Sequence, residues 1–171
     1  MENPIMKPLK KILLVVGLLA LAGCAGGGFG KFGANGADGA LANGAASDPN
    51  SPAYFEQAIG DRILFAVDQS SLSPEAITVL DGQATWLLAN AEFVASIEGH
   101  ADEQGTREYN LALSARRANS VQEYLITRGV SPDRLRVIPY GKERPLAICS
   151  NESCYSQNRR AVTVLAAGGL S

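Results

Sequence analysis

The sequence predicts an α/β domain, an α+β sandwich in which helices pack on one small mixed four-stranded sheet. Segments whose apolar residues repeat every two positions alternate with segments of helical period, in the order β-α-β-α-β-β. This pattern occupies residues 53–171, roughly 120 residues, which is enough chain for one hydrophobic core but not for two. We therefore expect one domain, preceded by extensions.

Residues 1–23 are predicted to be a signal peptide. A basic start with three lysines precedes an apolar run, Ile12–Ala22, that is too short to span a bilayer comfortably. The run ends in Leu21-Ala22-Gly23-Cys24, which resembles the lipobox of bacterial lipoproteins, where the chain is cleaved before the cysteine. An ordinary secretory signal and a buried helix are the alternative interpretations, and Met6 is an alternative start.

The segment after the signal, residues 24–52, is expected to be a lipid-anchored tether. Acylation of Cys24 would give stable anchoring, and Ala25 after it points to the outer membrane by the sorting rule of lipoproteins, which reserves Asp at this position for the inner membrane. The tether is rich in Gly, Ala and Asn, and its apolar residues repeat with neither the helical nor the strand period, so it cannot form a core. Its r.m.s. reach as a flexible coil is on the order of 30 Å.

The first half of the domain begins with a strand at Arg62–Val67, with Ile63, Phe65 and Val67 on one face. Ser73 and Pro74 then have the residue types of a helix N-cap and first position, and the helix should run to about Asn90. Its apolar face contains Ile77, Leu80, Ala84, Leu87 and Leu88, and Trp86 beside it is expected to pack in the core.

The second half is predicted to contain a strand at Phe93–Gly99 and a helix at Arg107–Arg128 that ends at Gly129. A strand at Leu135–Ile138 follows, broken by Pro139, and a last strand at Arg160–Leu165 comes after a loop. Residues on one face of the second helix follow a 4-3-4-4 spacing: Asn110, Ser114, Arg117, Val121 and Leu125.

Cys149 and Cys154 lie close together in the loop before the last strand. In an exported protein such a pair most simply forms a disulfide. A metal pair is the alternative, but His100 is the only histidine, so a zinc site would need carboxylates. We expect a disulfide and no metal.

The stretch Ile97–Ala118, IEGHADEQGTREYNLALSARRA, is the candidate functional segment. It places an acid, Asp102, in a polar loop and a base, Arg117, on the otherwise core-facing side of the following helix. A buried charge without a partner is costly, so from spacing alone a surface ion pair at Arg117 is the competing interpretation.

Four segments carry a family resemblance that spans Arg62–Val164: ILFAVDQSSLSPEA, IEGHADEQGTREYNLALSARRANSV, YGKERP and QNRRAV. They resemble the OmpA-like C-terminal domain family and, within it, the peptidoglycan-associated lipoproteins of the Tol–Pal system. The family pattern D-x-x-G-x-x-x-x-N-x-x-L-S-x-x-R-A falls on Asp102, Gly105, Asn110, Leu113, Ser114, Arg117 and Ala118.

The resemblance implies a binding site for the meso-diaminopimelate of the peptidoglycan stem peptide. Asp102 would accept from its ammonium group, while Arg117 would pair with its carboxylate. Asp68 is expected to line the pocket and Leu113 to give an apolar contact. Val67 departs from the family, where phenylalanine is frequent. Other residues are assigned weaker roles. His100 is expected to be a structural histidine whose hydrogen bonds are satisfied, and Tyr109 is as suited to packing as to binding. One of the two arginines Arg159 and Arg160 is expected to be structural, and the other is expected to lie near the ligand.

The function implied is an outer-membrane lipoprotein that faces the periplasm and ties the membrane to the cell wall, with roles in envelope integrity and cell division. The implied partners are peptidoglycan and the Tol-system propeller protein TolB, with TolA as a further candidate. The net charge of −2 and the few aromatics argue against nucleic acid, and we expect no cofactor. The alternatives are a glycoside hydrolase that uses Glu98 and Asp102, and a purely protein-binding module.

Overall fold

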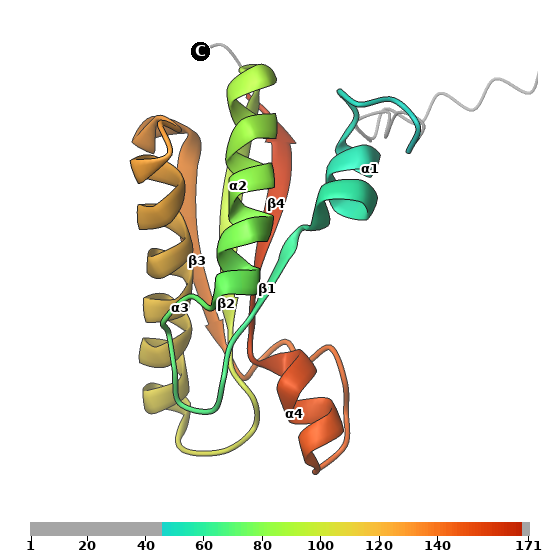
Figure 1. Cartoon of the computed structure of the whole chain (residues 1–171). Coiled ribbons are helices and arrows are strands. Elements are labelled where there is room, and N and C mark those ends of the chain that lie inside the picture. Colours follow the sequence, from blue (N-terminus) through green and yellow to red (C-terminus); the bar gives the residue numbers. More distant parts are fainter. Residues whose placement is uncertain (1–45, 169–171) are drawn as a thin grey trace, which may run out of the picture. The chain divides into compact units, whose positions relative to one another are not determined.

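The computed structural model describes residues 46–168 (Figure 1). The predicted signal peptide, Cys24 and most of the predicted tether lie outside these residues. The helices and strands are, in chain order, α1 (Pro52–Tyr54), the π-helical turn η1 (Phe55–Gly60), β1 (Arg62–Leu64), α2 (Pro74–Ala89), β2 (Phe93–His100), α3 (Arg107–Thr127), the 3-10 turn η2 (Pro132–Arg134), β3 (Leu135–Gly141), α4 (Glu152–Asn158) and β4 (Arg160–Ala167). Within this part of the chain, no helix has the length and apolar character needed to cross a membrane.

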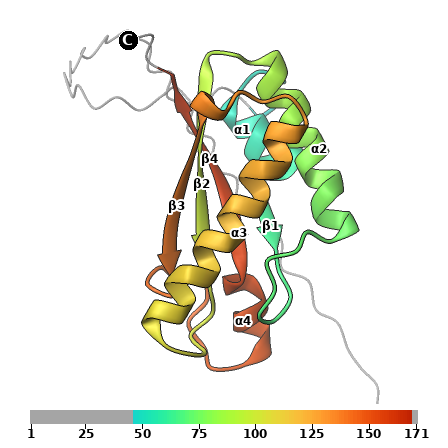
Figure 2. The same cartoon turned by 90° about the vertical axis from the view of Figure 1, so that its left-hand side faces the viewer.

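The strands form one mixed sheet in the order β1-β4-β2-β3. β4 pairs antiparallel with both β1 and β2, whereas β2 and β3 are parallel. The long helices α2 and α3 lie on the same side of this sheet, and α4 lies at its lower end (Figures 1 and 2). The predicted fold class and the mixed four-stranded sheet are confirmed.

The core lies between the sheet and the two long helices. Leu80, Ala84 and Leu87 of α2 are buried as predicted, but Ile77 and Leu88 are 37% and 51% exposed, because Gln83 and Trp86 occupy the buried side of the helix instead. Trp86 packs between Phe55 and Phe93, with ring centroids 5.0 and 5.2 Å away, as expected of a core residue.

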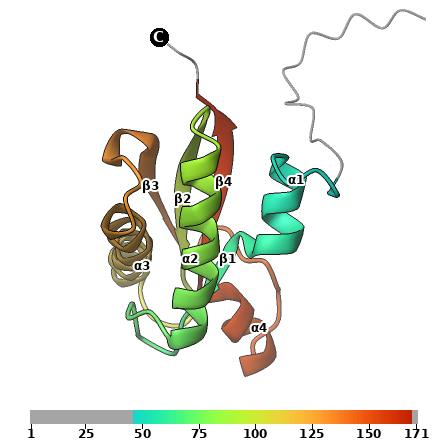
Figure 3. The ribbon, with the colours of Figure 1, turned by 45° about the horizontal axis from the view of Figure 1, so that its top comes forward.

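The chain enters the domain beside the last turn of α2. Trp86 Nε1 donates a 2.7 Å hydrogen bond to the carbonyl oxygen of Pro49, and Ser51 caps α1 by accepting from the Tyr54 amide. The residues just before α1 are therefore fastened to the core near α2 and α1 (Figure 3).

Two strand boundaries differ from the prediction. β1 ends at Leu64 rather than Val67, because the chain leaves the sheet after Phe65, where the Phe65 amide donates to the carbonyl of Arg159, and Val67 is 56% exposed. β3 continues through Pro139 to Gly141, since it is an edge strand, where a missing backbone N–H can be tolerated.

The helix α4 occupies the loop in which no helix was predicted. Asn151 caps it by accepting from the Ser153 amide at 3.0 Å, and a disulfide joins Cys149 to Cys154 around its first turn. Within residues 46–168 no group of three or more His, Cys, Asp or Glu side chains is placed to hold a metal ion.

Candidate functional site

The site is formed where β2 ends and α3 begins, and close packing of these two elements sets its geometry. A Cβ atom on Gly99 would lie 1.9 Å from the carbonyl oxygen of Ser114, so only glycine lets the helix approach the strand this closely. Ser114 is fully buried, and its Oγ accepts from the Gly141 amide at 2.9 Å. The beginning of α3 is thereby held against the ends of β2 and β3.

A cavity of about 300 Å³ opens between the start of α3, the loop after β2 and the segment after β1. Six of the seven predicted ligand-binding residues line it: Asp68, Asp102, Gly105, Asn110, Leu113 and Arg117. Ser114 does not line the cavity and instead holds α3 to β3. The other lining residues are Val67, Gln104 and Tyr109. Gln104 falls on a variable position of the motif, so no sequence pattern pointed to it.

Arg117 is fully buried, and its charge is surrounded by backbone carbonyls. Nε donates to Gln69 O at 2.8 Å, Nη1 to His100 O at 2.9 Å and Nη2 to Ala66 O at 3.2 Å. Among residues 46–168 it forms no salt bridge, so the predicted alternative of a surface ion pair is wrong. Burial lowers the pKa of Arg117 to about 10, which leaves the guanidinium charged at neutral pH.

Asp102 supplies the buried negative charge of the cavity and is itself 7% exposed, whereas the other lining carboxylate, Asp68, is exposed. Its Oδ1 accepts from the Gln104 amide at 3.1 Å, and its Oδ2 accepts from Arg159 Nη1 at 3.2 Å. Of the two arginines that were expected near the end of the chain, Arg159 is therefore the one beside the site. Arg160 donates to the carbonyls of Asn158 and Arg144 instead.

The mouth of the cavity is shaped by two backbone turns. Asp68 adopts a left-handed conformation with φ of 57°, and its Oδ1 accepts from the Tyr109 hydroxyl. Gly105 has φ of 92°, a region that glycine enters without strain. Asn110 Nδ2 donates to Gln104 O at 2.8 Å, which fixes the loop between Asp102 and the start of α3.

His100 lies outside the cavity, and it contacts the site only through its carbonyl oxygen, which holds Arg117. The ring is buried and stacks on Tyr140 with a centroid distance of 5.4 Å. Neither ring nitrogen has a hydrogen-bond partner within the described part of the chain, and the nearest carboxylate, Glu98, lies 3.8 Å from Nε2. The ring is therefore structural, as expected, but the expectation that its hydrogen bonds are satisfied is wrong. Burial, with a smaller contribution from nearby arginines, lowers the pKa of His100 to about 4 and keeps the ring neutral.

Asp102 and Arg117 thus place opposite charges on the walls of one cavity. Such an arrangement suits a ligand group that carries both an ammonium and a carboxylate, because each charge of the ligand finds its complement.

Comparison with known proteins places these features in a family. A model of the OmpA family matches residues 64–159. The chain is 54% identical over 129 residues to a protein named peptidoglycan-associated lipoprotein from Rhizobium meliloti, a match that covers 75% of this chain and 73% of the relative. A protein of the same name from Agrobacterium fabrum is 47% identical over 130 residues, covering 76% of this chain and 73% of the relative.

Comparison with solved structures gives the same family. The crystal structure of the peptidoglycan-associated lipoprotein from Burkholderia pseudomallei matches with a TM-score of 0.63 and 34% identity, covering 71% of this chain and 98% of that one. The C-terminal domain of Helicobacter pylori MotB, at 20% identity, shows only that the fold is shared, with a TM-score of 0.59 over 64% of this chain and 86% of that one. The chain therefore belongs to the OmpA family and, within it, to the peptidoglycan-associated lipoproteins.

Proposed function

We propose that the protein is an outer-membrane lipoprotein that binds peptidoglycan non-covalently through the diaminopimelate of the stem peptide. The observation that carries this proposal is the buried guanidinium of Arg117, which forms no salt bridge with a carboxylate among residues 46–168 and lines the same cavity as Asp102. The names of the relatives at 47–54% identity support peptidoglycan as the ligand.

The free end of diaminopimelate is an amino acid zwitterion, and the cavity offers a complement to each of its charges. A guanidinium has five N–H groups, and three backbone carbonyls take one each from Nε, Nη1 and Nη2 of Arg117. One N–H then remains on each terminal nitrogen for the carboxylate of the ligand. The free lone pairs of Asp102 accept from the ammonium. A lysine-type stem lacks the carboxylate and would leave Arg117 unpaired, which disfavours its binding.

The cellular role follows from the anchor and the ligand together. Acylated Cys24 would hold the chain in the outer membrane, residues 24–52 would act as a tether, and the domain would bind the cell wall. We propose that it works in the Tol–Pal system, in envelope integrity and constriction during division, with the propeller protein TolB as a partner and TolA as a further candidate. Competition between purified TolB and sacculi for the domain would show that the two binding surfaces overlap, and simultaneous binding would exclude that overlap.

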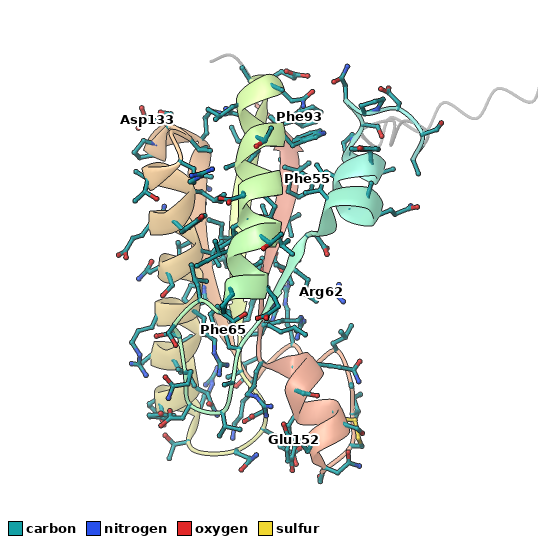
Figure 4. The ribbon with its side chains drawn as sticks, in the orientation of Figure 1. Phe55, Arg62, Phe65, Phe93, Asp133 and Glu152 are labelled. Carbon is teal, nitrogen blue, oxygen red and sulfur yellow. A yellow bond between two sulfur atoms is a disulfide. The ribbon has the colours of Figure 1, made fainter. Side chains whose placement is uncertain are left out.

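Sedimentation with purified sacculi tests the binding site. We expect Asp102→Asn to weaken sedimentation about tenfold or more, because the neutral amide cannot balance the ligand ammonium. The control is Asp133→Asn, an equivalent change in η2, which lies at the opposite end of the domain from Glu152 and Phe65 (Figure 4). If both variants sediment like the parent, the site is wrongly assigned.

We expect no catalysis at this site. Hydrolysis of the glycan by Glu98 and Asp102 would need these two carboxylates on either side of the bond, but Glu98 does not line the cavity and instead lies 3.8 Å from His100 Nε2. Asp68, the second carboxylate that does line the cavity, is exposed and accepts from the Tyr109 hydroxyl. Incubation of the purified protein with sacculi should therefore release no soluble fragments. Release of fragments that Asp102→Asn abolishes would favour the hydrolase alternative.

A further inference from the structure

Arg159 connects the two charges of the proposed site to the rest of the domain. Its Nε donates to Phe65 O at 3.2 Å, and its own carbonyl accepts from the Phe65 amide at 2.9 Å. The Phe65 ring in turn lies 5.4 Å from the guanidinium carbon of Arg117. Through Nη1, Arg159 also donates to Asp102 Oδ2 at 3.2 Å. A change at Arg159 therefore reaches both walls of the cavity.

Glu152 is the other partner of Arg159. Its two carboxylate oxygens accept from Nη1, at 3.3 Å, and from Nη2, so the pairing is bidentate. Glu152 is the first residue of α4 and lies inside the short loop closed by the Cys149–Cys154 disulfide. Figure 4 shows it at the same end of the domain as Phe65.

A second contact fastens α4 to the loop of the site. The Tyr155 hydroxyl donates to Glu103 Oε1 at 2.8 Å, and Glu103 directly follows Asp102 in the chain. The hydrogen bonds of Glu103 with Ser150 and Tyr155 lower the pKa of its carboxyl group. The disulfide-closed turn is thus linked to the Asp102 loop both through Arg159 and directly.

The charges buried in the site indicate why the pairing of Glu152 with Arg159 matters for the ligand. Arg117, Arg159 and Asp102 are 0%, 4% and 7% exposed, so the buried part of the site holds two cations and one anion. The carboxylate of Asp68 also lines the cavity, but that residue is exposed to solvent. A zwitterionic ligand adds an ammonium that has to compete with Arg159 for Asp102. Glu152 neutralises Arg159 from the other side, and this leaves more of the negative charge of Asp102 for the ligand.

We therefore propose that Glu152, held in place by the Cys149–Cys154 disulfide, is a positioning residue that makes the Asp102 carboxylate available to the ammonium group of the ligand. This inference rests on the proposed function, because it concerns the same cavity and the same zwitterion. It assigns the selectivity for the ammonium group to a side chain that does not line the cavity.

The test uses Glu152→Gln and two synthetic stem peptides. One peptide contains diaminopimelate, and the other lacks the amino group at the free end but keeps the carboxylate. We expect Glu152→Gln to weaken binding of the first peptide about tenfold, because Arg159 then competes fully for Asp102, and to change binding of the second peptide less than about twofold. Calorimetric titration of the full domain measures both affinities.

Glu143→Gln is the matched control. Glu143 also pairs with an arginine, Arg107, at 3.0 Å, but it does not line the cavity, so its loss should leave both affinities unchanged. The double variant Cys149→Ser, Cys154→Ser keeps Glu152 and removes only the disulfide that holds it in place. We expect this variant to bind the diaminopimelate peptide several-fold more weakly and to bind the peptide without the amino group nearly as well as the parent does.

The outcomes separate this inference from the proposed function. If the parent binds the diaminopimelate peptide and Glu152→Gln binds it equally well, Glu152 has no positioning role. An equal loss for both peptides would also overturn the inference, since it indicates a general loss of structure. A parent that binds neither peptide would overturn the proposed function and, with it, the inference.

Discussion

Arg117 keeps its charge in the core because three backbone carbonyls take the place of the water that it loses. Two of these carbonyls, from Ala66 and Gln69, belong to the segment after β1, and the third, from His100, ends β2. The guanidinium therefore closes that segment onto the sheet. The same side chain is part of the architecture and part of the proposed ligand site.

Arg117→Ala should consequently reduce stability as well as binding. Three carbonyls would lose their donors and a cavity would replace the side chain, so we expect the free energy of unfolding to fall by about 3 kcal/mol. Urea denaturation measures this change. Arg116→Ala is the control. Arg116 is the exposed neighbour of Arg117, so its replacement should change the free energy of unfolding by less than about 0.5 kcal/mol. Equal stability of the two variants would contradict the structural role.

His100 should make the stability depend on pH. Its folded pKa of about 4 lies below the ordinary value of 6.5, so the folded state binds no proton over a range in which the unfolded state does. Its contribution to stability is complete above pH 6.5 and is lost as the pH falls towards 4. Between pH 7 and 4.5 the loss is roughly 2 kcal/mol.

His100→Phe keeps a ring against Tyr140 and removes the titrating group. Denaturation curves from pH 7 to 4.5 should therefore show a smaller decrease in stability for this variant than for the parent. Parallel decreases in both proteins would show that His100 is not the group that titrates.

Single residues also show how far the sequence could predict the site. Asp102 and Arg117 were predicted, because a polar loop and an arginine on a core-facing helix side are local patterns that match a family motif. The link from Glu152 through Arg159 to Asp102 was not, since it joins residues 57 positions apart through a helix that was not expected. Such a contact depends on tertiary packing that no local pattern encodes.

At the scale of secondary-structure elements, the packing of α3 on β2 determines where the site lies. The close approach at Gly99 sets the distance between α3 and β2, and the hydrogen bond of Ser114 fixes the first half of α3 to β3. This arrangement brings the cationic Arg117, about one turn further along α3, over the end of β2.

Gly99→Ala should therefore displace the helix. The added Cβ would meet the backbone carbonyl of Ser114 at 1.9 Å, and a backbone atom cannot rotate away. We expect a loss of about 3 kcal/mol in stability and a loss of peptide binding. Gly82→Ala in α2 is the control, because its nearest contact is the flexible Ile59 side chain at 3.1 Å. Comparable thermal stability of the two variants would contradict this role of Gly99.

The elements that the sequence predicted well are the long ones. Caps at Ser73 and the glycine after Arg128 define α2 and α3, and each helix has a long buried side. β1 and α4 were harder to predict because they are short. β1 ends early as its chain turns to meet Arg159, and α4 begins at an Asn151 cap inside a disulfide loop.

At the scale of the whole molecule, the site and the chain entry lie at different ends of the domain. Pro49 is fastened to Trp86 in the last turn of α2, whereas the cavity is lined by Val67 and Asp68, which precede α2. Figures 1 and 3 show α1 away from α4 and from the loop between β2 and α3. Within residues 46–168, the point at which the chain enters the domain is therefore separate from the cavity.

The most direct measurement is a calorimetric or NMR titration of the domain with a diaminopimelate-containing stem peptide and with its lysine analogue. The buried, carbonyl-held Arg117 predicts saturable binding of the first peptide, with shifts at Asp102 and Arg117, and binding of the lysine peptide at least about tenfold weaker. Equal affinity for the two peptides would contradict recognition of the carboxylate by Arg117, and an absence of binding to either would contradict the proposed site as a whole.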